Sequence, residues 1–518
     1  MKNSIIIFAI ALFAGAIFMT GCDQGREYPT MDERVVTVSV KEDPTVSFRI
    51  WFRVGAQDDH AGKEGLAWLT AQTMANGATQ NNKYEEIIDK LYPMAADYGV
   101  KVDKEMTVFS GRVHKDMLDE YYKLFTDAML HPAFNKEDFQ RIKDETISYI
   151  ANELRYSSDE ELGKAALYSY IYEGTNYGHL TQGTVESLKS ITLEDVKNFY
   201  KDHYTRDNYV IGAGGGFDKE LPEKMFVDFQ SLVQRIPELK AATQPEKIEG
   251  LNVLLVEKDN DATAISFGFP IDVQRGDDDF FALALFNSWF GQHRNSASHL
   301  YQVIRETRGM NYGDYSYIEP FLNGGSLRNP IPNNARRSNI FEVWIRPVRH
   351  EHAHFALRAA IRELRKVIEN GLSEEEFVLT QDFLHKYALH YAPNTMMRLG
   401  YQLDSKFFGI EDGGDYIEFF RNKIRSLTRK QVNEAIRNHL NYQNIKIAMV
   451  TNNAEDFKSR LVDNAPSPIS YETPKPDAVI AEDQVIAEYP LDIKAENVII
   501  VPVDQMFEKT VGRVIAKK

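Results

Sequence analysis

The chain has 518 residues, of which 43% are hydrophobic and 26% are charged. That length is too great for one hydrophobic core, so the composition predicts a globular protein of two domains or more. The formal net charge of −16 argues against nucleic acid as a partner, because phosphate binding needs a basic surface.

The N-terminal segment is typical of a bacterial lipoprotein signal. Lys2 precedes an apolar run over residues 5–18, which is short for a bilayer span, and Met19-Thr20-Gly21-Cys22 follows. Small residues directly before a cysteine resemble the lipoprotein cleavage box, so we expect residues 1–21 to be removed and Cys22 to carry lipid. The alternative is a signal peptide with an incidental cysteine.

Lipid at Cys22 implies a membrane partner and a place in the bacterial cell envelope, on the periplasmic side or at the cell surface. Residues 22–35 then form a polar tether. Asp23 resembles a signal for retention in the inner membrane, but that rule differs between bacteria, so both membranes stay open. Cys22 is the only cysteine, which excludes an internal disulfide.

A strand, a loop and a helix are predicted over residues 46–77. Residues 46–52 show a period of two, which predicts a strand. From about Glu64 the apolar residues recur at helical spacing, and Asn76-Gly77 is expected to end the helix.

This unit resembles the opening of the pitrilysin/insulinase family of zinc metallopeptidases, peptidase family M16. In that family a Gly-Leu-Ala lead-in precedes the inverted zinc motif H-x-x-E-H on the helix. Gly65-Leu66-Ala67 is present here, but Trp68 and Gln72 occupy the two histidine positions, and Ala71 occupies the position of the glutamate. The resemblance therefore implies the fold of the family without its catalytic motif.

Zinc chemistry depends on those positions. Two histidines at i and i+4 converge on one metal, and the glutamate takes a proton from the bound water. The third ligand of the family, a glutamate, falls near Ser148 and Tyr149, and a small gap would bring Glu145 or Glu153 into register. One carboxylate does not hold zinc, so we expect no catalytic residue and no metal here. The resemblance implies zinc in a partner subunit.

Two landmarks recur along the chain and predict two related halves. A strand and a helix that ends at Phe139 recur as a strand and a helix that ends at Phe377, 238 residues later. A helix through Val196 that precedes a strand recurs around Val432, 236 residues later. The predicted fold class is α+β: two homologous α/β-layer domains, each an antiparallel-rich sheet with helices on one face, with a repeat of about 237 residues.

The repeat sets the expected domain boundaries. Residues 36–240 form an N-terminal domain with the degenerate zinc motif, and residues 251–461 form a C-terminal domain. The polar stretch Pro237–Gly250 is the predicted linker. Residues 462–518 form a tail that we expect to pack on the second domain.

Two further patterns receive a structural interpretation. The run Gly212–Gly216 follows a strand but lacks the G-x-G-x-x-G spacing, so it predicts a turn after an edge strand instead of a dinucleotide site. His350, His352 and His354 cluster where a strand passes into a long helix, which favours a polar helix start over a metal site.

The second domain carries a more specific feature. Residues 298–318 predict a helix to Arg308, a stop at Gly309 and a strand from about Tyr312. Arg305 and Tyr312 stand seven residues apart across this turn, as an arginine and a tyrosine do in the C-terminal domain of the family. There the pair hydrogen-bonds the substrate or its oxyanion, and both side chains are suitable donors. The alternative is an arginine near a helix C-terminus and a tyrosine on a half-buried strand.

The resemblance covers about Val35 to Leu461, and some members of the family work as two chains, of which one supplies zinc and the other the Arg/Tyr pair. It implies a non-catalytic, substrate-binding subunit of a heteromeric zinc metallopeptidase, which clamps extended peptides and supplies Arg305 and Tyr312 to a partner's zinc site. The alternative is a catalytically dead peptidase-fold lipoprotein that acts as a binding or scaffold module in the cell envelope. No Ser/His/Asp or Cys/His arrangement in the sequence supports a different enzyme.

Overall fold

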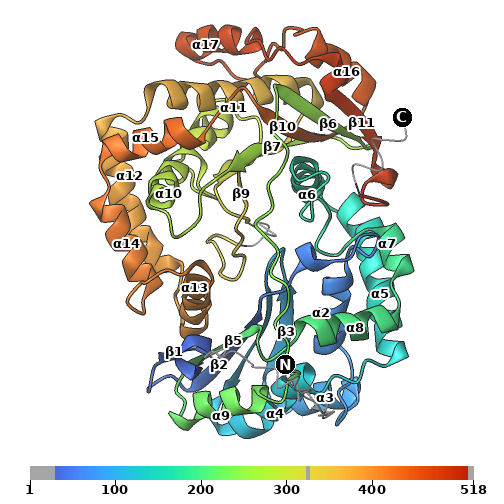
Figure 1. The fold of residues 1–518 in the computed structure, drawn as a ribbon. Coiled ribbons are helices and arrows are strands. Elements are labelled where there is room, and N and C mark those ends of the chain that lie inside the picture. The colour runs from blue at the N-terminus through green and yellow to red at the C-terminus, as the bar shows by residue number, and fades with distance from the viewer. Residues whose placement is uncertain (1–29, 322–326, 511–518) are drawn as a thin grey trace, which may run out of the picture.

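Two mixed sheets with helices packed on them form the molecule, one in each half of the chain (Figure 1). The computed structural model describes residues 30–321 and 327–510. The predicted signal segment and lipid site, residues 1–21 and Cys22, lie outside the described residues. Within the described part of the chain, no helix has both the length and the apolar composition that crossing a membrane requires.

The first sheet consists of β1 (Val35–Ser39), β2 (Thr45–Phe52), β3 (Asp97–Val102), β4 (Thr107–His114) and β5 (Tyr209–Gly215). The strands lie in the order β1-β5-β2-β4-β3. β1 and β5 are parallel, and the other neighbours are antiparallel. β2 is buried along nearly its whole length, because both faces of this sheet are covered.

The first half has nine helices in its described part: α1 (Met31–Arg34), α2 (Leu66–Ala75), α3 (Tyr84–Leu91), α4 (Leu118–Leu130), α5 (Lys136–Ser148), α6 (Asp159–Ile171), α7 (Val185–Ser190), α8 (Leu193–His203) and α9 (Glu220–Phe229). α2 and α4 contact the sheet, and α5 and α8 pack against α2. This arrangement places the helix with the degenerate motif between the sheet and a second helical layer.

The second sheet consists of β6 (Leu251–Glu257), β7 (Thr263–Ile271), β8 (Asp314–Tyr317), β9 (Asn339–Val348), β10 (Ile445–Thr451) and β11 (Val498–Pro502). The strands lie in the order β11-β6-β10-β7-β9-β8. β10 is parallel to β6 and antiparallel to β7, as β5 is to β1 and β2. This correspondence confirms the predicted α+β class with two homologous domains.

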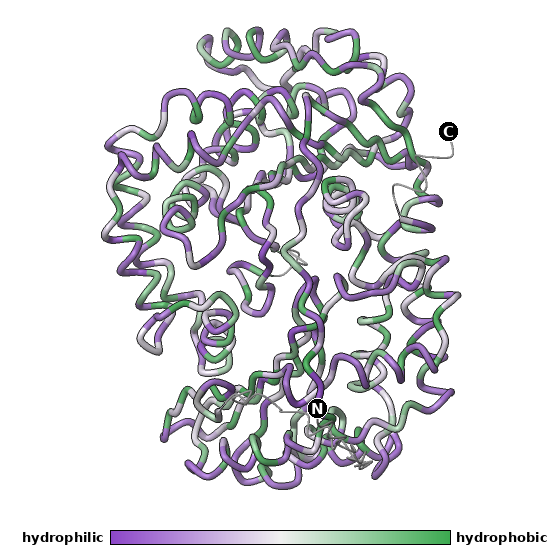
Figure 2. The backbone as a smooth tube through the Cα atoms, in the orientation of Figure 1, coloured by the Kyte–Doolittle hydropathy of each residue, from purple (hydrophilic) through white to green (hydrophobic). Residues whose placement is uncertain are grey.

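The helices of the second half are α10 (Asp278–Gly291), α11 (His350–Asn370), α12 (Glu374–Tyr387), α13 (Thr395–Phe408), α14 (Tyr416–Ser426), α15 (Arg429–His439) and α16 (Ala454–Val462), with α17 (Asp477–Ala487) in the tail. Figure 2 shows hydrophobic and hydrophilic residues alternating along the outer helices. Such alternation is expected where a helix buries one face and exposes the other.

One helix from each half covers the second face of the other half's sheet. α6 packs on β7 and β10, and α13 packs on β1, β2 and β5 (Figure 1). Gly212 of β5 makes room for α13, since a Cβ atom there would lie 3.2 Å from the methyl carbons of Leu399 and Leu403. The glycine run thus serves helix packing. The prediction of an edge strand is wrong, because β5 has β1 on one side and β2 on the other.

The two helical stretches that mark the repeat are each broken into two helices. α4 and α5 are separated at Pro132, and Asn135 caps α5 by accepting a hydrogen bond from Asp138 N at 2.8 Å. α11 and α12 are separated at Gly371, whose φ of +70° favours glycine. Each predicted continuous helix is therefore two helices joined by a short turn.

The tail contacts both halves, not the second half alone. β11 extends the second sheet beside β6. Met506 and Phe507 are buried in the core of the first half, and Val185 N donates to Phe507 O at 3.0 Å. Arg155 Nη2 lies 3.1 Å from a Glu508 carboxylate oxygen. The tail therefore ties the two halves to each other.

Candidate functional site

The helix with the degenerate zinc motif is fixed at its N-terminal end. Gly65 has a φ of +99°, and the buried Asp59 carboxylate accepts hydrogen bonds from Gly65 N and Ala67 N, both at 2.7 Å. Burial raises the pKa of Asp59 to about 8, although these two hydrogen bonds act in the opposite direction. Asp59 thus determines where α2 begins and which way the motif positions face.

The positions that would bear the two histidines border one cavity. Trp68 Nε1 donates to Thr146 Oγ1 of α5 at 3.2 Å, and Gln72 Oε1 accepts from Asn76 Nδ2 at 2.7 Å. Trp68 and Gln72 line a cavity of about 390 Å³ together with Tyr149, which begins the π-helical continuation of α5. The two-helix frame of a zinc site is present, with an indole and an amide in place of imidazoles.

The carboxylates near the third ligand position do not complete a metal site. Glu145 borders the same cavity, but its side chain is 63% exposed and lies 3.5 Å from Arg141 Nη1. Glu153 is also exposed. Among the described residues, no three His, Cys, Asp or Glu side chains are grouped so that they could hold a metal ion. The side chains that face one another at α2 and α5 do not fit zinc, so we assign no catalytic step to them.

The histidine cluster does not converge on one point. Nδ1 of His350 lies 2.8 Å from Thr263 Oγ1, and its Nε2 lies 2.9 Å from Asn260 O. His354 is buried near Phe457, and this burial lowers the pKa of its imidazole to about 3. Both side chains belong to the packing at the start of α11.

Arg305 and Tyr312 lie at the surface of the second half. Arg305 Nη1 lies 3.2 Å from Glu306 Oε2, and the guanidinium carbon lies 5.6 Å from the ring centre of Tyr301. Arg305 Nε is buried without a hydrogen-bond partner among the described residues. Tyr312 is 78% exposed and precedes β8. Both side chains therefore carry donor groups that the described contacts do not saturate.

Two of the positions selected from the sequence fall on π-helical backbone. The described residues contain two such segments, Tyr149–Leu154 and Tyr301–Glu306. The first begins at Tyr149, near the expected position of the third ligand, and the second contains Arg305. π-Helical turns are rare in globular proteins and are frequent at functional sites.

A cleft of about 410 Å³ lies between the two halves. α2, β3 and α6 supply one side, and β9 and residues 327–338, which we call the crossing segment, supply the other. Its aromatic lining comes from both halves: Trp68, Tyr149, Tyr168, Phe321 and Trp344. Its charged lining consists of Lys101, Lys104, Glu161, Lys164, Arg336 and Glu342.

The crossing segment joins the halves through ion pairs. Arg336 Nε donates to the two carboxylate oxygens of Asp103 at 3.0 and 3.2 Å, and both side chains are buried. Arg337 Nε donates to Glu105 Oε2 at 2.5 Å, and Glu105 also accepts a hydrogen bond from Tyr177. Because breaking a buried pair leaves a charge without compensation, these contacts hold the cleft in one shape.

Two of the three lysines that line the cleft, Lys101 and Lys104, have neutral hydrogen-bond partners. Lys101 Nζ donates to the side-chain oxygen of Asn334, and Lys104 Nζ donates to the backbone oxygen of His179. Burial lowers the pKa of Lys101 to about 8 and that of Lys104 to about 7. Neither amine therefore has a carboxylate as a hydrogen-bond partner, although the charge of Asp103 partly offsets the effect of burial on both.

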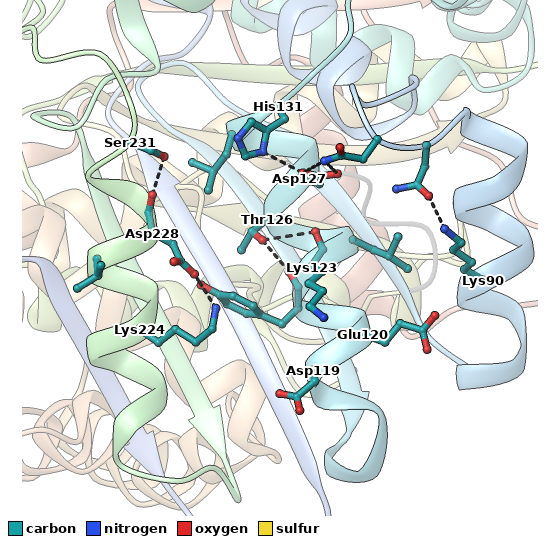
Figure 3. A pocket seen from close by; sticks show the side chains of 16 residues that line it. Lys90, Asp119, Glu120, Lys123, Thr126, Asp127, His131, Lys224, Asp228 and Ser231 are labelled. Carbon is teal, nitrogen blue, oxygen red and sulfur yellow. Dashed lines mark hydrogen bonds and ion pairs between the residues drawn. The ribbon is translucent and has the colours of Figure 1, made fainter.

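A second groove, of about 970 Å³, lies on the outer surface of the first half (Figure 3). Two of the four carboxylates that line it, Asp127 and Asp228, are already engaged. Asp127 accepts from Asn81 at 2.8 Å and lies 2.9 Å from His131 Nδ1, while Asp228 accepts from Tyr122 at 2.8 Å and from Lys224 at 2.7 Å. These contacts join neighbouring helices and loops, so we assign the groove no chemistry.

Apart from Trp68 and Tyr149, the sequence did not single out the cleft residues. Asp103 and Arg336 are 233 positions apart, and the strand and loop that carry them have ordinary local patterns. The adjacent arginines Arg336 and Arg337 are the one signal available, and two arginines in a predicted loop do not identify their partners.

The fold has two similar domains, and the described residues at α2 and α5 supply no set of zinc ligands. The chain belongs to peptidase family M16. The model for Insulinase (Peptidase family M16) matches residues 34–185, and the model for the Peptidase M16 inactive domain matches residues 190–384. These matches confirm the family resemblance that the sequence motifs indicated.

Known proteins resemble the chain over half of its length or more. An uncharacterized zinc protease of Streptomyces coelicolor is 23% identical over 356 residues, which cover 66% of this chain and 72% of that protein. The beta subunit of the mitochondrial-processing peptidase of Dictyostelium discoideum is 22% identical over 269 residues, which cover 50% of this chain and 56% of that subunit.

A solved structure of a peptidase M16 inactive domain from Pseudomonas fluorescens has a TM-score of 0.70 at 23% identity, with 81% of this chain and 95% of that chain covered. A protease from Helicobacter pylori has a TM-score of 0.69 at 14% identity, with 80% and 96% covered. At these identities the structural likeness shows the fold alone.

Proposed function

We propose that this chain is a non-catalytic, substrate-binding subunit of an M16-type metallopeptidase. It holds an extended peptide and supplies Arg305 and Tyr312 to the zinc site of a homologous partner. The observation that carries the proposal is the replacement of the zinc ligands on α2. This helix faces α5, but Trp68 donates a hydrogen bond to Thr146 where a metal site would need a ligand.

The position of the Arg/Tyr pair supports action on another chain. Tyr312 is 78% exposed, and Arg305 keeps a buried Nε–H group without a partner in the described part of the chain. The described residues that line this chain's own cleft include neither of them. Donors of this kind stabilise the negative charge that develops on a peptide carbonyl during hydrolysis.

The edge of the first sheet supports the binding of an extended peptide. β3 is the last strand of its sheet, and Val100, Lys101 and Val102 of this strand line the cleft. The outer backbone groups of an edge strand pair readily with a further extended segment. We also propose that Cys22 carries lipid, which would place this subunit at a membrane of the bacterial cell envelope.

Reconstitution with a zinc-bearing M16 chain of the same organism tests the proposal. The partner alone should cleave a fluorescence-quenched peptide poorly, and activity should rise with added chain until the two are equimolar. The chain alone should show no cleavage, because Trp68, Ala71 and Gln72 supply neither ligands nor a base.

A partner whose activity does not change with added chain would reject the subunit proposal. In that case the alternative, a binding or scaffold module with an M16 fold, becomes the better account. Peptide capture by the chain without cleavage by any partner would then be its defining activity.

A further inference from the structure

We propose that the interdomain cleft binds an apolar ligand with one carboxylate, of the kind that a peptide presents when its last residue is bulky and its C-terminus is free. The inference rests on the proposed function and deepens it, because it names the chemical class of peptide end that the cleft accepts. It uses groups other than Arg305 and Tyr312, and it needs no partner subunit.

The first observation is a pair of buried amines that have no carboxylate as a hydrogen-bond partner. In the described part of the chain, the ammonium groups of Lys101 and Lys104 have only neutral oxygens as hydrogen-bond partners, on Asn334 and His179. The side chain of Arg336, on the crossing segment, also lines the cleft, but Asp103 already neutralises it. A charged hydrogen bond is stronger than a neutral one, so a ligand carboxylate would give these amines an acceptor that the described residues do not supply.

The second observation is a pair of unused donors. Arg336 Nη1 and Tyr168 Oη are both buried and have no hydrogen-bond partner among the described residues. The Arg336 guanidinium carbon lies 4.8 Å from the ring centre of Tyr168, so the two groups are neighbours on the cleft wall. Buried donors normally have acceptors, and a carboxylate accepts from a guanidinium and a hydroxyl together.

The aromatic lining determines the rest of the ligand. Trp68, Tyr149 and Phe321 border the cleft and offer apolar surface. Trp344 lies beneath Lys164, whose Nζ stands 3.6 Å from the indole ring centre. A volume of about 410 Å³ is within the usual range for small-molecule sites. A ligand with one bulky apolar side chain next to its carboxylate would match both the aromatic and the basic residues that line the cleft.

The acidic side chains of the cleft are already engaged. Glu161 lies 2.8 Å from Lys164 Nζ, and Glu342 accepts a hydrogen bond from Trp344 Nε1 at 2.9 Å. Burial raises the pKa of Glu342 to about 7, so this carboxyl group attracts a cationic ligand less strongly than an exposed carboxylate does. The unused capacity of the cleft is therefore for an anion and not for a cation.

Calorimetry with the mature chain tests the proposal. The probes are N-acetyl-Leu-Phe with a free carboxylate, the same dipeptide as its C-terminal amide, and octanoate. We expect the free acid to bind about tenfold more tightly than the amide, because a hydrogen bond to a charged group is stronger than one to a neutral group. Tighter binding of octanoate than of the dipeptide acid would support the same carboxylate site but assign it to fatty acids.

Tyr168→Phe and Lys104→Met should each remove most of the preference for the acid. Tyr168→Phe is the sharper variant, because it deletes a hydroxyl without a partner and leaves the ring in place. Tyr98→Phe is the matched control, since Tyr98 also has a buried hydroxyl without a partner among the described residues but does not line the cleft. It should bind like the parent.

Equal affinity for acid and amide would overturn the proposal, and so would unchanged binding by Tyr168→Phe. Either result would leave the proposed function intact, since these measurements include no zinc-bearing partner. Conversely, a partner that works without this chain would reject the proposed function and leave the carboxylate preference measurable.

Discussion

At the scale of single residues, Trp68 shows how one position can change the use of a helix. Its ring borders both the cavity between α2 and α5 and the cleft between the halves, and its N–H group is satisfied by Thr146. An indole cannot ligate zinc, but it offers a large apolar surface to a ligand. At this position the chain therefore has part of the cleft wall where the resembling peptidases have a metal ligand.

The ion pair between Asp103 and Arg336 should contribute strongly to stability. Both side chains are buried, so Asp103→Asn leaves the guanidinium without its counter-charge. We expect this variant to lose about 3–5 kcal/mol of unfolding free energy in urea titrations. The control is Asp382→Asn, which breaks an exposed pair with Arg425 and should change little. Similar urea midpoints for the two variants would contradict the stabilising role of the Asp103–Arg336 ion pair.

His354 should make the protein sensitive to acid. Its pKa is about 3 in the folded chain and about 6.5 in the unfolded chain, so the unfolded state binds more protons between these values. The free energy of unfolding therefore falls as the pH drops below about 6.5, and the loss due to His354 reaches roughly 2 kcal/mol at pH 5. His354→Phe keeps a ring beside Phe457 and should flatten the fall in unfolding free energy between pH 6.5 and 4.5. Parallel pH profiles would contradict the assignment.

Cys22 should determine where the protein resides. If it carries lipid, Cys22→Ser moves the protein from the membrane fraction to the soluble fraction and abolishes metabolic labelling with fatty acid. A parent protein that takes up no label and is already soluble would refute the lipoprotein hypothesis.

At the scale of elements, the α2–α5 pair retains the geometry of a zinc site without its chemistry. Trp68 and Gln72 are one helical turn apart, and Tyr149 borders their common cavity from the facing helix. Trp68 and Gln72 stand where the resembling peptidases have two histidines, and Tyr149 lies near the expected position of the third ligand. The frame should therefore accept a metal when ligands are restored.

Restoring the ligands tests that geometry. Trp68→His with Gln72→His should bind zinc weakly, and the addition of Tyr149→Glu should bring the content to about one tightly held zinc per chain. The parent chain, measured by the same elemental analysis after dialysis, should hold none in stoichiometric amount. Equal zinc retention by the double and triple variants would show that Tyr149 does not face the pair.

The elements differed in how far the sequence predicted them. The repeat, the strand at 46–52 and the turn at Gly309 follow from local periodicity and stop residues, and the structure has each of them. The sequence pattern does not predict the helix breaks at Pro132 and Gly371, because the apolar pattern continues through both turns. The frame of the candidate site was likewise predictable from the motif at Gly65–Ala67.

At the scale of the whole molecule, three elements make two similar domains into one closed body. α6 and α13 each pack on the sheet of the other half (Figure 1). The crossing segment forms ion pairs between the halves, and the tail contacts both of them. None of these features could be predicted, because each depends on contacts between residues that are distant in sequence, such as Asp103 and Arg336. The cleft is a product of that closure, so the sequence could not reveal it.

The central claim is that Arg305 and Tyr312 act on a partner's zinc site, and kcat of the reconstituted pair tests it most directly. Arg305→Ala and Tyr312→Phe should each lower kcat about a hundredfold, because each removes a donor used mainly in the transition state. Size-exclusion chromatography should show that both variants still assemble with the partner. Arg425→Ala and Tyr92→Phe, which change exposed residues elsewhere, should retain full activity. Full kcat for assembled Arg305→Ala and Tyr312→Phe would contradict the account.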